Sequence, residues 1–300
     1  MREGRSSPAG TDGRTGAKTA FVLGGGANLG AHEVGMLRAL FEAGIRPDLV
    51  VGTSVGAVNA ALVAAHPGPA AADELEKVWN GLGRYGVFGA SLLDRVATAV
   101  RSGTHLYSNR PLRDLLEASV PVGRIEDLRL PFQCVAASIE RAADHWFTEG
   151  PLIDAVLASC AVPGLLPPVE IGGEHFLDGG LVDSIPVGRA VALGARTIYV
   201  LQVGRIERAL AVPRRPWEVA AVAFEIARRH RYVRSMNDLP DHVTVHVLPT
   251  GTPSPDYADI RQHLQYRNAS LTRSRIDAAY RASARYLSTL VNTPPEPGAA

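Results

Sequence analysis

A serine lies between two glycines in the pentapeptide Gly52-Thr53-Ser54-Val55-Gly56, which has the pattern GxSxG. A serine on a tight turn between a strand and a helix projects its hydroxyl out of the sheet, and small neighbours let the two elements approach closely. The N-terminus of the following helix adds free N–H groups and the positive end of a dipole. A chance match is the alternative in a chain with 30 glycines. The strand–turn–helix context favours Ser54 as a nucleophile.

A second glycine cluster, Gly24-Gly25-Gly26-Ala27-Asn28-Leu29-Gly30, also lies between an expected strand and an expected helix. Consecutive glycines let backbone N–H groups converge on one point without interference from Cβ atoms. Such a nest binds an anion, either a phosphate or the oxyanion of an acyl-transfer intermediate. A nucleotide P-loop needs Lys and Ser or Thr after its last glycine, and here Ala31-His32 follow. The remaining alternative is an ordinary tight turn.

A third cluster, Asp178-Gly179-Gly180, follows His175-Phe176-Leu177. A carboxylate at the end of a strand, followed by two flexible residues, can point into a site. Taken alone the signal is weak, because Asp-Gly is a common turn dipeptide.

The segments around these clusters predict a parallel α/β arrangement. Residues 19–23 and 49–51 are compact apolar runs, typical of buried strands. Helical spacing of apolar residues starts at Ala31 and again at Val55, the second helix ending near Ala65. Further helices are expected at 70–82, 91–101, 111–119, 152–159, 186–193, 217–236 and up to about 290; further strands are expected at 132–138, 145–148, 169–171, 175–177, 197–203 and 243–248.

Composition excludes several classes of protein. The chain has 300 residues, 46% of them apolar, and a formal charge of +1, so neither intrinsic disorder nor general nucleic-acid binding is expected. Its two cysteines, Cys134 and Cys160, form no CxxC pair, so we expect buried reduced thiols, no metal and no cofactor. The N-terminus lacks the apolar region of a signal peptide, and no transmembrane helix is expected. The sequence therefore predicts a cytoplasmic protein, with peripheral contact at the inner membrane face as an open alternative.

Together the three clusters resemble the bacterial patatin-like phospholipases. GGGANLG resembles the glycine-rich oxyanion-hole motif of that family, GTSVG its nucleophile elbow and DGG its Asp-Gly-Gly/Ala element. The resemblance covers about residues 19–203, and it includes the connecting stretch 158–164. It implies a three-layer α/β/α sandwich with a mainly parallel central sheet, and hydrolysis of lipid acyl esters. It also implies a dyad without histidine, in which Ser54 is the nucleophile and Asp178 the base.

The expected mechanism follows from these roles. Asp178 takes the proton of Ser54, and backbone N–H groups of Gly24, Gly25, Gly26 and Val55 form the oxyanion hole. Burial should raise the pKa of Asp178, because a carboxylate with an ordinary pKa is a weak base at neutral pH. The other glycines of the motifs, expected to shape the turns, are Gly30, Gly52, Gly56, Gly179 and Gly180.

The sequence departs from the family pattern in ways that leave alternatives open. Leu29 stands where the family loop usually has Arg or Lys, which favours a broad acyl-ester hydrolase over a headgroup-specific phospholipase. Asp183 could compete with Asp178 as the base. A non-catalytic relative that binds lipid or a partner is a second reading. A carboxylesterase with a Ser-His-Asp triad is a third, its histidine being one of His230, His242, His246 and His263.

We expect one catalytic unit with flexible ends. The expected division is a polar arm at 1–18, a catalytic core at 19–203, a C-terminal extension of helices and a strand at 204–292 packed on the same domain, and a tail at 293–300. The helix at 217–236 places Trp217, Ala220, Ala221, Phe224 and Ala227 at apolar spacings, followed by several arginines. An ordinary amphipathic helix is favoured over a membrane-surface helix. The expected partner is a lipid or acyl-ester substrate; the sequence leaves the oligomeric state open.

Overall fold

The computed structural model describes residues 18–85, 89–203, 209–252 and 269–292. In this part of the chain eight strands form one sheet, in the order β5-β6-β3-β2-β1-β7-β8 with β4 beside β3. The strands are β1 Lys18–Leu23, β2 Leu49–Thr53, β3 Phe132–Ser138, β4 Ala143–Phe147, β5 Val169–Ile171, β6 Glu174–Asp178, β7 Ala195–Leu201 and β8 Thr244–Val247. The strands β3, β2, β1, β7 and β8 are neighbours in this order and run parallel. Strands β4 and β6 pair antiparallel with β3, and β5 pairs antiparallel with β6.

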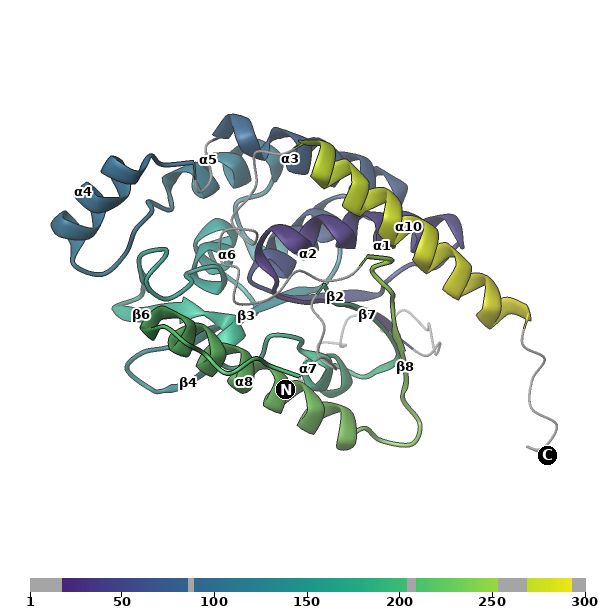
Figure 1. The fold of residues 1–300 in the computed structure, drawn as a ribbon. Helices are drawn as coiled ribbons and strands as arrows, with labels where there is room; N and C mark the ends of the chain where they lie inside the picture. The colour runs from purple at the N-terminus through teal and green to yellow at the C-terminus, as the bar shows by residue number, and fades with distance from the viewer. Residues whose placement is uncertain (1–17, 86–88, 204–208, 253–268, 293–300) are drawn as a thin grey trace, which may run out of the picture.

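Helices cover both faces of the sheet (Figure 1). They are α1 Ala31–Glu42, α2 Val55–Ala65, α3 Pro69–Tyr85, α4 Leu92–Ser102, α5 Arg110–Ser119, α6 Leu152–Ser159, α7 Val187–Ala192, α8 Pro216–Asn237 and α10 Ala269–Asn292, with 3₁₀ turns η1 Ala27–Gly30, η2 Ile125–Asp127 and η3 Gly179–Leu181. Helices α1, α2, α3 and α10 lie above the sheet in Figure 1, and α7 and α8 lie below it. The expected three-layer α/β/α fold is confirmed.

Alternation along β1 explains the three layers. Successive side chains of a strand point to opposite faces. Phe21 and Leu23 pack into the larger cluster, with α1, α2 and α3. Ala20 and Val22 pack into the smaller one, with Val187 and its neighbours on α7. A strand that is buried on both faces reads as a continuous apolar run, which is why 19–23 is recognisable in the sequence.

The predicted element boundaries agree with the structure to within about three residues. Helices α2 and α6 and strand β3 have the predicted bounds. Strand β2 continues through Gly52 and Thr53, up to the residue before Ser54. Helix α4 begins with a capping box in which Ser91 and Asp94 bond to each other's backbone, and it ends at Gly103 with positive φ.

Strand β3 brings two distant segments end to end. One edge of β3 pairs with β4, and its other edge is shared between β2 and β6. Thr53, the last residue of β2, lies opposite Val135, and Asp178, the last residue of β6, lies opposite the next residue, Ala136. Because β2 is parallel to β3 and β6 is antiparallel, the two strands end facing each other. Ser54 and Asp178 therefore meet at adjacent positions of one strand.

Helix α10 closes the upper layer against α1. A Cβ atom at Gly35 would lie 2.1 Å from the carbonyl oxygen of Ile276, so only glycine allows the two helices to approach this closely. Among the described helices, none is both long enough and apolar enough to cross a bilayer.

Candidate active site

Ser54 sits on a sharp turn between β2 and α2. Its backbone has φ 56° and ψ −127°, a conformation that is uncommon for a residue with a side chain. The two flanking glycines make this turn sterically possible. A Cβ at Gly52 would lie 2.4 Å from the Gly56 carbonyl oxygen, and one at Gly56 would lie 2.2 Å from the Leu23 carbonyl oxygen. The GxSxG pattern thus reflects close contacts between β1, β2 and α2.

The hydroxyl of Ser54 donates a hydrogen bond to Asp178. Ser54 Oγ lies 2.6 Å from Asp178 Oδ2, and the second carboxylate oxygen, Oδ1, accepts from the Gly180 N–H at 2.7 Å. The backbone N–H of Ser54 donates to Ser159 Oγ at 2.9 Å, which ties the turn to α6. Both oxygens of the carboxylate are thus fixed, with one aimed at the serine.

Burial raises the pKa of Asp178 to about 6, although the hydrogen bonds from Ser54 and Gly180 and the charge of Arg228 oppose the rise. The residue is 1% exposed. A carboxylate has stronger basicity when its pKa approaches the working pH, so this environment suits proton transfer near neutrality.

Asp183 is a second buried carboxylate close to this turn. Burial raises its pKa to about 6 as well. Its backbone carbonyl accepts from Thr53 Oγ1 at 2.8 Å, but its side chain makes no hydrogen bond to Ser54, and Oδ1 has no hydrogen-bond partner among the described residues. The geometry therefore favours Asp178 over Asp183 as the partner of the serine.

Four carbonyls of the glycine loop are held by side chains from four different helices. Arg228 on α8 donates to Gly25 O at 3.1 Å, and Arg275 on α10 donates to Asn28 O at 3.2 Å. His32 Nδ1 on α1 donates to Leu29 O at 2.8 Å, and Asn59 Nδ2 on α2 donates to Gly30 O at 3.1 Å. These bonds fix the carbonyls of the loop and thereby the orientation of its peptide planes.

Not every expected oxyanion donor is free. The N–H of Gly24 donates to Leu201 O at 3.1 Å, and that of Gly25 donates to Ser184 O at 3.0 Å. Val55 is the first residue of α2, so its N–H has no acceptor within the helix. The N–H of Gly26 has no hydrogen-bond partner in the described part of the chain. Of the four expected donors, Gly24 and Gly25 therefore have N–H groups that are already engaged, whereas those of Gly26 and Val55 have no such partner in the described part of the chain.

A buried polar network supports the loop from behind. Asn59 also donates to Glu33 Oε2 at 2.7 Å and accepts from Trp79 Nε1 at 3.0 Å. Burial raises the pKa of Glu33 well above its usual range, although the hydrogen bond from Asn59 opposes the rise. Burial also lowers the pKa of His32 to about 4, so its ring is neutral and holds the loop through Nδ1–H.

The histidines proposed for a triad do not reach the serine. No described histidine is hydrogen-bonded to Ser54 or Asp178. His230 and His242 are exposed, and His246 bonds to the hydroxyl of Tyr286 at 3.2 Å. His263 lies outside the described residues. Both cysteines are buried and unpaired, as expected.

Sequence reasoning missed the residues that hold the site from a distance. Arg228 was expected to be a cation near the end of an amphipathic helix, yet its side chain is buried and contacts the glycine loop. Phe224 was expected at an apolar position of this helix without a stated contact, and a Cβ at Gly180 would lie 2.8 Å from its ring. On the same helix Arg229 forms an ion pair with Glu225, four residues earlier, at 3.0 Å. The side chains of Trp217 and Ala220 lie outside the described residues.

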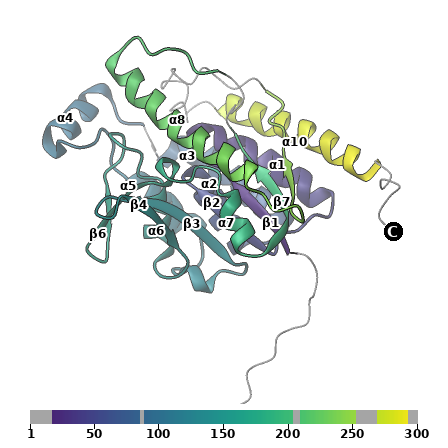
Figure 2. The same cartoon turned by 90° about the horizontal axis from the view of Figure 1, so that it is seen from below.

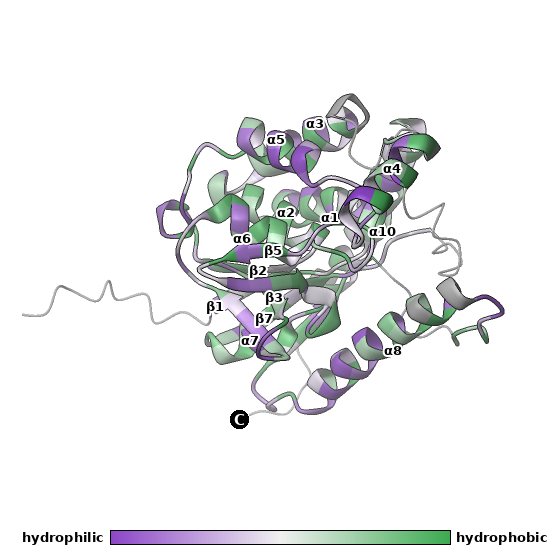
Figure 3. Ribbon diagram, turned by 90° about the vertical axis from the view of Figure 1, so that its left-hand side faces the viewer, coloured by the Kyte–Doolittle hydropathy of each residue, from purple (hydrophilic) through white to green (hydrophobic). Residues whose placement is uncertain are grey.

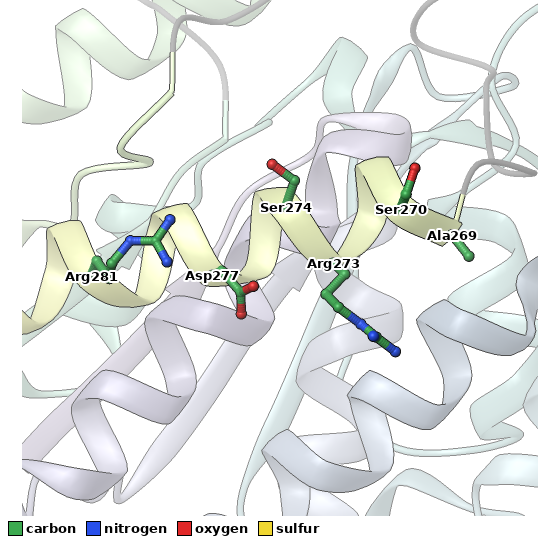
Figure 4. A pocket seen from close by; sticks show the side chains of 6 residues that line it. All are labelled: Ala269, Ser270, Arg273, Ser274, Asp277 and Arg281. Atoms are coloured by element: carbon green, nitrogen blue, oxygen red, sulfur yellow. The ribbon is translucent and has the colours of Figure 1, made fainter.

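A hollow beside the first half of α10 is separate from this site (Figure 4). Its lining comes from one helix and includes none of the residues above: Ala269, Ser270, Arg273, Ser274, Asp277 and Arg281. Within the described ranges, no group of three or more His, Cys, Asp or Glu side chains is placed to hold a metal ion.

Comparison with known proteins identifies the family. A family model described as patatin-like phospholipase matches residues 21–191, a stretch that contains all three motifs. The chain belongs to the patatin-like phospholipase family. Helix α8 and helix α10, which reach the glycine loop through Arg228 and Arg275, lie beyond the matched stretch.

Several relatives share this patatin-like region. The patatin-like phospholipase domain-containing protein ZK370.4 of Caenorhabditis elegans is 35% identical over 196 residues, which is 64% of this chain and 14% of that protein. Lysophospholipase nte1 of Aspergillus terreus is 34% identical over 192 residues, 64% of this chain and 12% of that protein. Human patatin-like phospholipase domain-containing protein 6 is 31% identical over 192 residues, which is 63% of this chain and 14% of that protein. The chain thus spans a small part of these curated relatives. Among solved structures, VipD from Legionella pneumophila is 14% identical with a TM-score of 0.42, over 91% of this chain and 67% of that chain.

Proposed function

We propose that this patatin-like chain is a serine acyl hydrolase that cleaves lipid acyl esters through Ser54 and Asp178. The observation that carries the proposal is the 2.6 Å hydrogen bond from Ser54 Oγ to a buried carboxylate oxygen of Asp178. Two observations support it: the family of the chain, and relatives that are named lysophospholipases.

In this mechanism Asp178 removes the proton of Ser54 while Oγ attacks the ester carbonyl carbon. The N–H groups of Gly26 and Val55 donate to the oxyanion of the tetrahedral intermediate. Its collapse expels the alcohol, which takes the proton from Asp178, and leaves an acyl group on Ser54. Water then attacks this acyl-serine, with Asp178 again as the base, and releases the fatty acid.

The substrate class we favour is broad. The glycine loop from Gly24 to Gly30 has no charged side chain, and Leu29 is buried in the apolar core. The buried Arg228 is bonded to Glu225, Ser184 and Gly25, so its charge is already engaged. We therefore propose single-chain lipids and simple acyl esters as substrates, without selection for an anionic headgroup.

Covalent labelling and product analysis test the proposal together. A fluorophosphonate probe should label wild-type protein at Ser54, as located by peptide mass spectrometry. Incubation with lysophosphatidylcholine and lysophosphatidylglycerol should release free fatty acid from both at rates within about tenfold of each other. A protein that binds these lipids but neither labels nor releases fatty acid would be a non-catalytic relative, and the proposal would be wrong.

The pH dependence of kcat/KM should show one acidic limb with a midpoint near 6. Asp178 acts as a base only when ionised, and burial raises its pKa to about 6, so activity should fall as pH decreases through that value. The measurement is a pH–rate profile with a soluble ester that does not itself ionise between pH 5 and 8. Asp183→Asn is the matched control, because the pKa of Asp183 is also about 6. The limb should persist in this variant; its loss there would assign it to Asp183.

Two helices offer apolar faces through which this chain could meet its substrate. On α4, Leu93 and Val100 are each 82% exposed, with Val96 between them. On α8, Val219, Ile226 and Val233 recur every seven residues along the outward face. Helices α4 and α8 project on the same side of the body, at the right of Figure 3. We propose that these two stripes rest on a lipid bilayer during turnover.

Ile226→Asp and Val100→Asp should each reduce binding to phosphatidylcholine vesicles about tenfold, because each removes part of the 1.5–3 kcal/mol that burying such a side chain contributes. Co-sedimentation measures the binding, and hydrolysis of a soluble ester should stay unchanged. Ile139→Asp is the control, since Ile139 is 47% exposed but lies outside both helices. Equal loss in all three variants, or no vesicle binding by wild type, would contradict the bilayer contact.

A further inference from the structure

Arg228 is a buried arginine that crosses from α8 to the glycine loop. It is 7% exposed, and each of its nitrogens has a partner. Nη2 donates to Gly25 O at 3.1 Å, Nε donates to Ser184 Oγ at 2.6 Å, and Nη1 donates to Glu225 Oε1 at 2.8 Å. Arg228 lies 203 residues from Gly25 and outside the stretch matched by the family model, so the family pattern gives this arginine no role.

The arginine and Ser184 together hold Gly25 at both ends. The Gly25 N–H donates to the backbone carbonyl of Ser184 at 3.0 Å, while the Gly25 carbonyl accepts from Arg228. Gly25 also packs on the nucleophile, because a Cβ at this position would lie 3.4 Å from Ser54 Cβ. The loop therefore has a fixed orientation at the residue that contacts Ser54.

The bond to Gly25 O also fixes the next donor. The Gly25 carbonyl and the Gly26 N–H belong to the same planar trans peptide, so they point in opposite directions. A guanidinium on the oxygen side holds the N–H on the other side. It also polarises the peptide, since a charged donor on a carbonyl strengthens the hydrogen bond that the N–H of the same unit can make.

We propose that Arg228 is a positioning residue for the oxyanion hole: it holds and polarises the peptide between Gly25 and Gly26, so that the Gly26 N–H stabilises the oxyanion formed on the acyl group at Ser54. This inference rests on the proposed hydrolase function. The loop itself has no cation, so the positive charge acts on the oxyanion through the peptide rather than by contacting substrate.

Glu225 allows the charge to be buried. Burial opposes ionisation of Glu225, but the charges and hydrogen bonds of Arg228 and Arg229 hold the pKa of its carboxyl below the usual value. A paired arginine with every nitrogen engaged is tolerated in an interior where an isolated one is not. The ion pair with Glu225, at 2.8 Å, therefore compensates the buried charge of Arg228.

A purely structural role for Arg228 makes different predictions. If the arginine only anchored α8, its replacement would lower thermal stability and reduce the fraction of active protein, with kcat per labelled site unchanged. A positioning role acts in the transition state, so it changes kcat and leaves KM nearly constant. It also changes the pH profile, because the charge of Arg228 lowers the pKa of Asp178. Its removal should move the acidic limb to higher pH.

The experiment compares Arg228→Gln, Arg228→Lys and the neighbouring control Arg229→Gln in the full chain. For a soluble ester, Arg228→Gln should lower kcat per fluorophosphonate-titrated site by about 10–100-fold, somewhat less than direct loss of an oxyanion donor, with KM within about twofold. The acidic limb of the pH–rate profile of this variant should move to higher pH. Arg228→Lys, which keeps the charge, should recover most of kcat, and the midpoint of its acidic limb should be that of the wild type. Arg229→Gln, which also loses a bond to Glu225, should behave as wild type.

Ser184→Ala provides a second test should Arg228→Gln unfold. It removes the acceptor of Nε while the bond to Gly25 remains, and it should lower kcat a few fold at constant KM and melting temperature. Wild-type kcat per labelled site in Arg228→Gln, or in Ser184→Ala when the former does not fold, would overturn the inference and leave the hydrolase function standing. A wild-type protein that neither labels nor hydrolyses esters would refute the function, and the inference with it.

Discussion

Ser54→Ala is expected to abolish ester hydrolysis, with kcat reduced by about 10⁴-fold or more. The Oγ oxygen is the only heavy atom removed, and its O–H is the donor to Asp178 Oδ2 at 2.6 Å. The remaining rate would come from substrate binding and the oxyanion donors alone. Steady-state hydrolysis of a soluble ester measures the loss, and labelling by the fluorophosphonate probe should vanish in parallel. Retained labelling at another residue would show that Ser54 is not the nucleophile.

The same position offers a stability test of the turn. Ser54 has φ 56° and ψ −127°, a conformation that costs about 1–3 kcal/mol for a residue with a Cβ. Ser54→Ala keeps that cost, and Ser54→Gly removes it at an entropic penalty of about 0.5–1 kcal/mol. Both variants lose the bond to Asp178. The glycine variant should therefore be more stable than the alanine variant by about 1 kcal/mol in urea unfolding. Equal stability would indicate an unstrained turn.

The sequence was sufficient to predict the fold because its signals are local. Residues 19–23 form a compact apolar run, which is typical of a strand that is buried on both faces. Ala31 and Val55 begin the predicted helices directly after glycine-rich turns. GxSxG is only partly local: Gly56 excludes a Cβ at Gly52, whereas Leu23 on β1, 33 residues earlier, excludes one at Gly56.

The meeting of Ser54 and Asp178 depends on β3, which contains neither residue. The register places Thr53 opposite Val135 and Asp178 opposite Ala136, so the approach of Ser54 to Asp178 is set by two consecutive apolar residues of a central strand. Nothing in the composition of 132–138 signals this, because apolar strand residues carry no register information of their own. Only the resemblance to a family paired the two residues before the fold was known.

The support of the glycine loop could not be predicted from sequence at all. Arg228 lies 203 residues after Gly25, and Arg275 lies 247 residues after Asn28, the two residues whose carbonyls they bind. Arg228 lies near the middle of α8 and Arg275 in the first third of α10, so neither position in its helix reveals that the side chain is buried. The same holds for Gly24 and Gly25, whose N–H groups are engaged by Leu201 and Ser184 from distant segments.

Asp178→Asn is expected to lower kcat by about 10³-fold or more, whereas Asp183→Asn should keep activity within a few fold of wild type. The two carboxylates form a matched pair, because both are buried and both have a pKa raised to about 6. They differ in geometry, since of the two only Asp178 accepts a hydrogen bond from the Ser54 hydroxyl. In Asp178→Asn the amide oxygen would accept from the Gly180 N–H, and the amide NH₂ would then donate to Ser54 Oγ, so no base faces the hydroxyl.

Neither substitution should lose activity by unfolding. An acid whose pKa is higher in the folded state than in the unfolded state binds more protons when folded, so its contribution to stability falls as pH increases from about 4 to 6. At pH 7.5 both carboxylates are ionised and buried, and an uncharged asparagine removes that cost in each case. Thermal melting should therefore show that both variants are folded. Asp183→Asn also removes the negative charge from a carboxylate whose Oδ1 has no hydrogen-bond partner among the described residues. Activity lost in Asp183→Asn and kept in Asp178→Asn would reverse the assignment of the base.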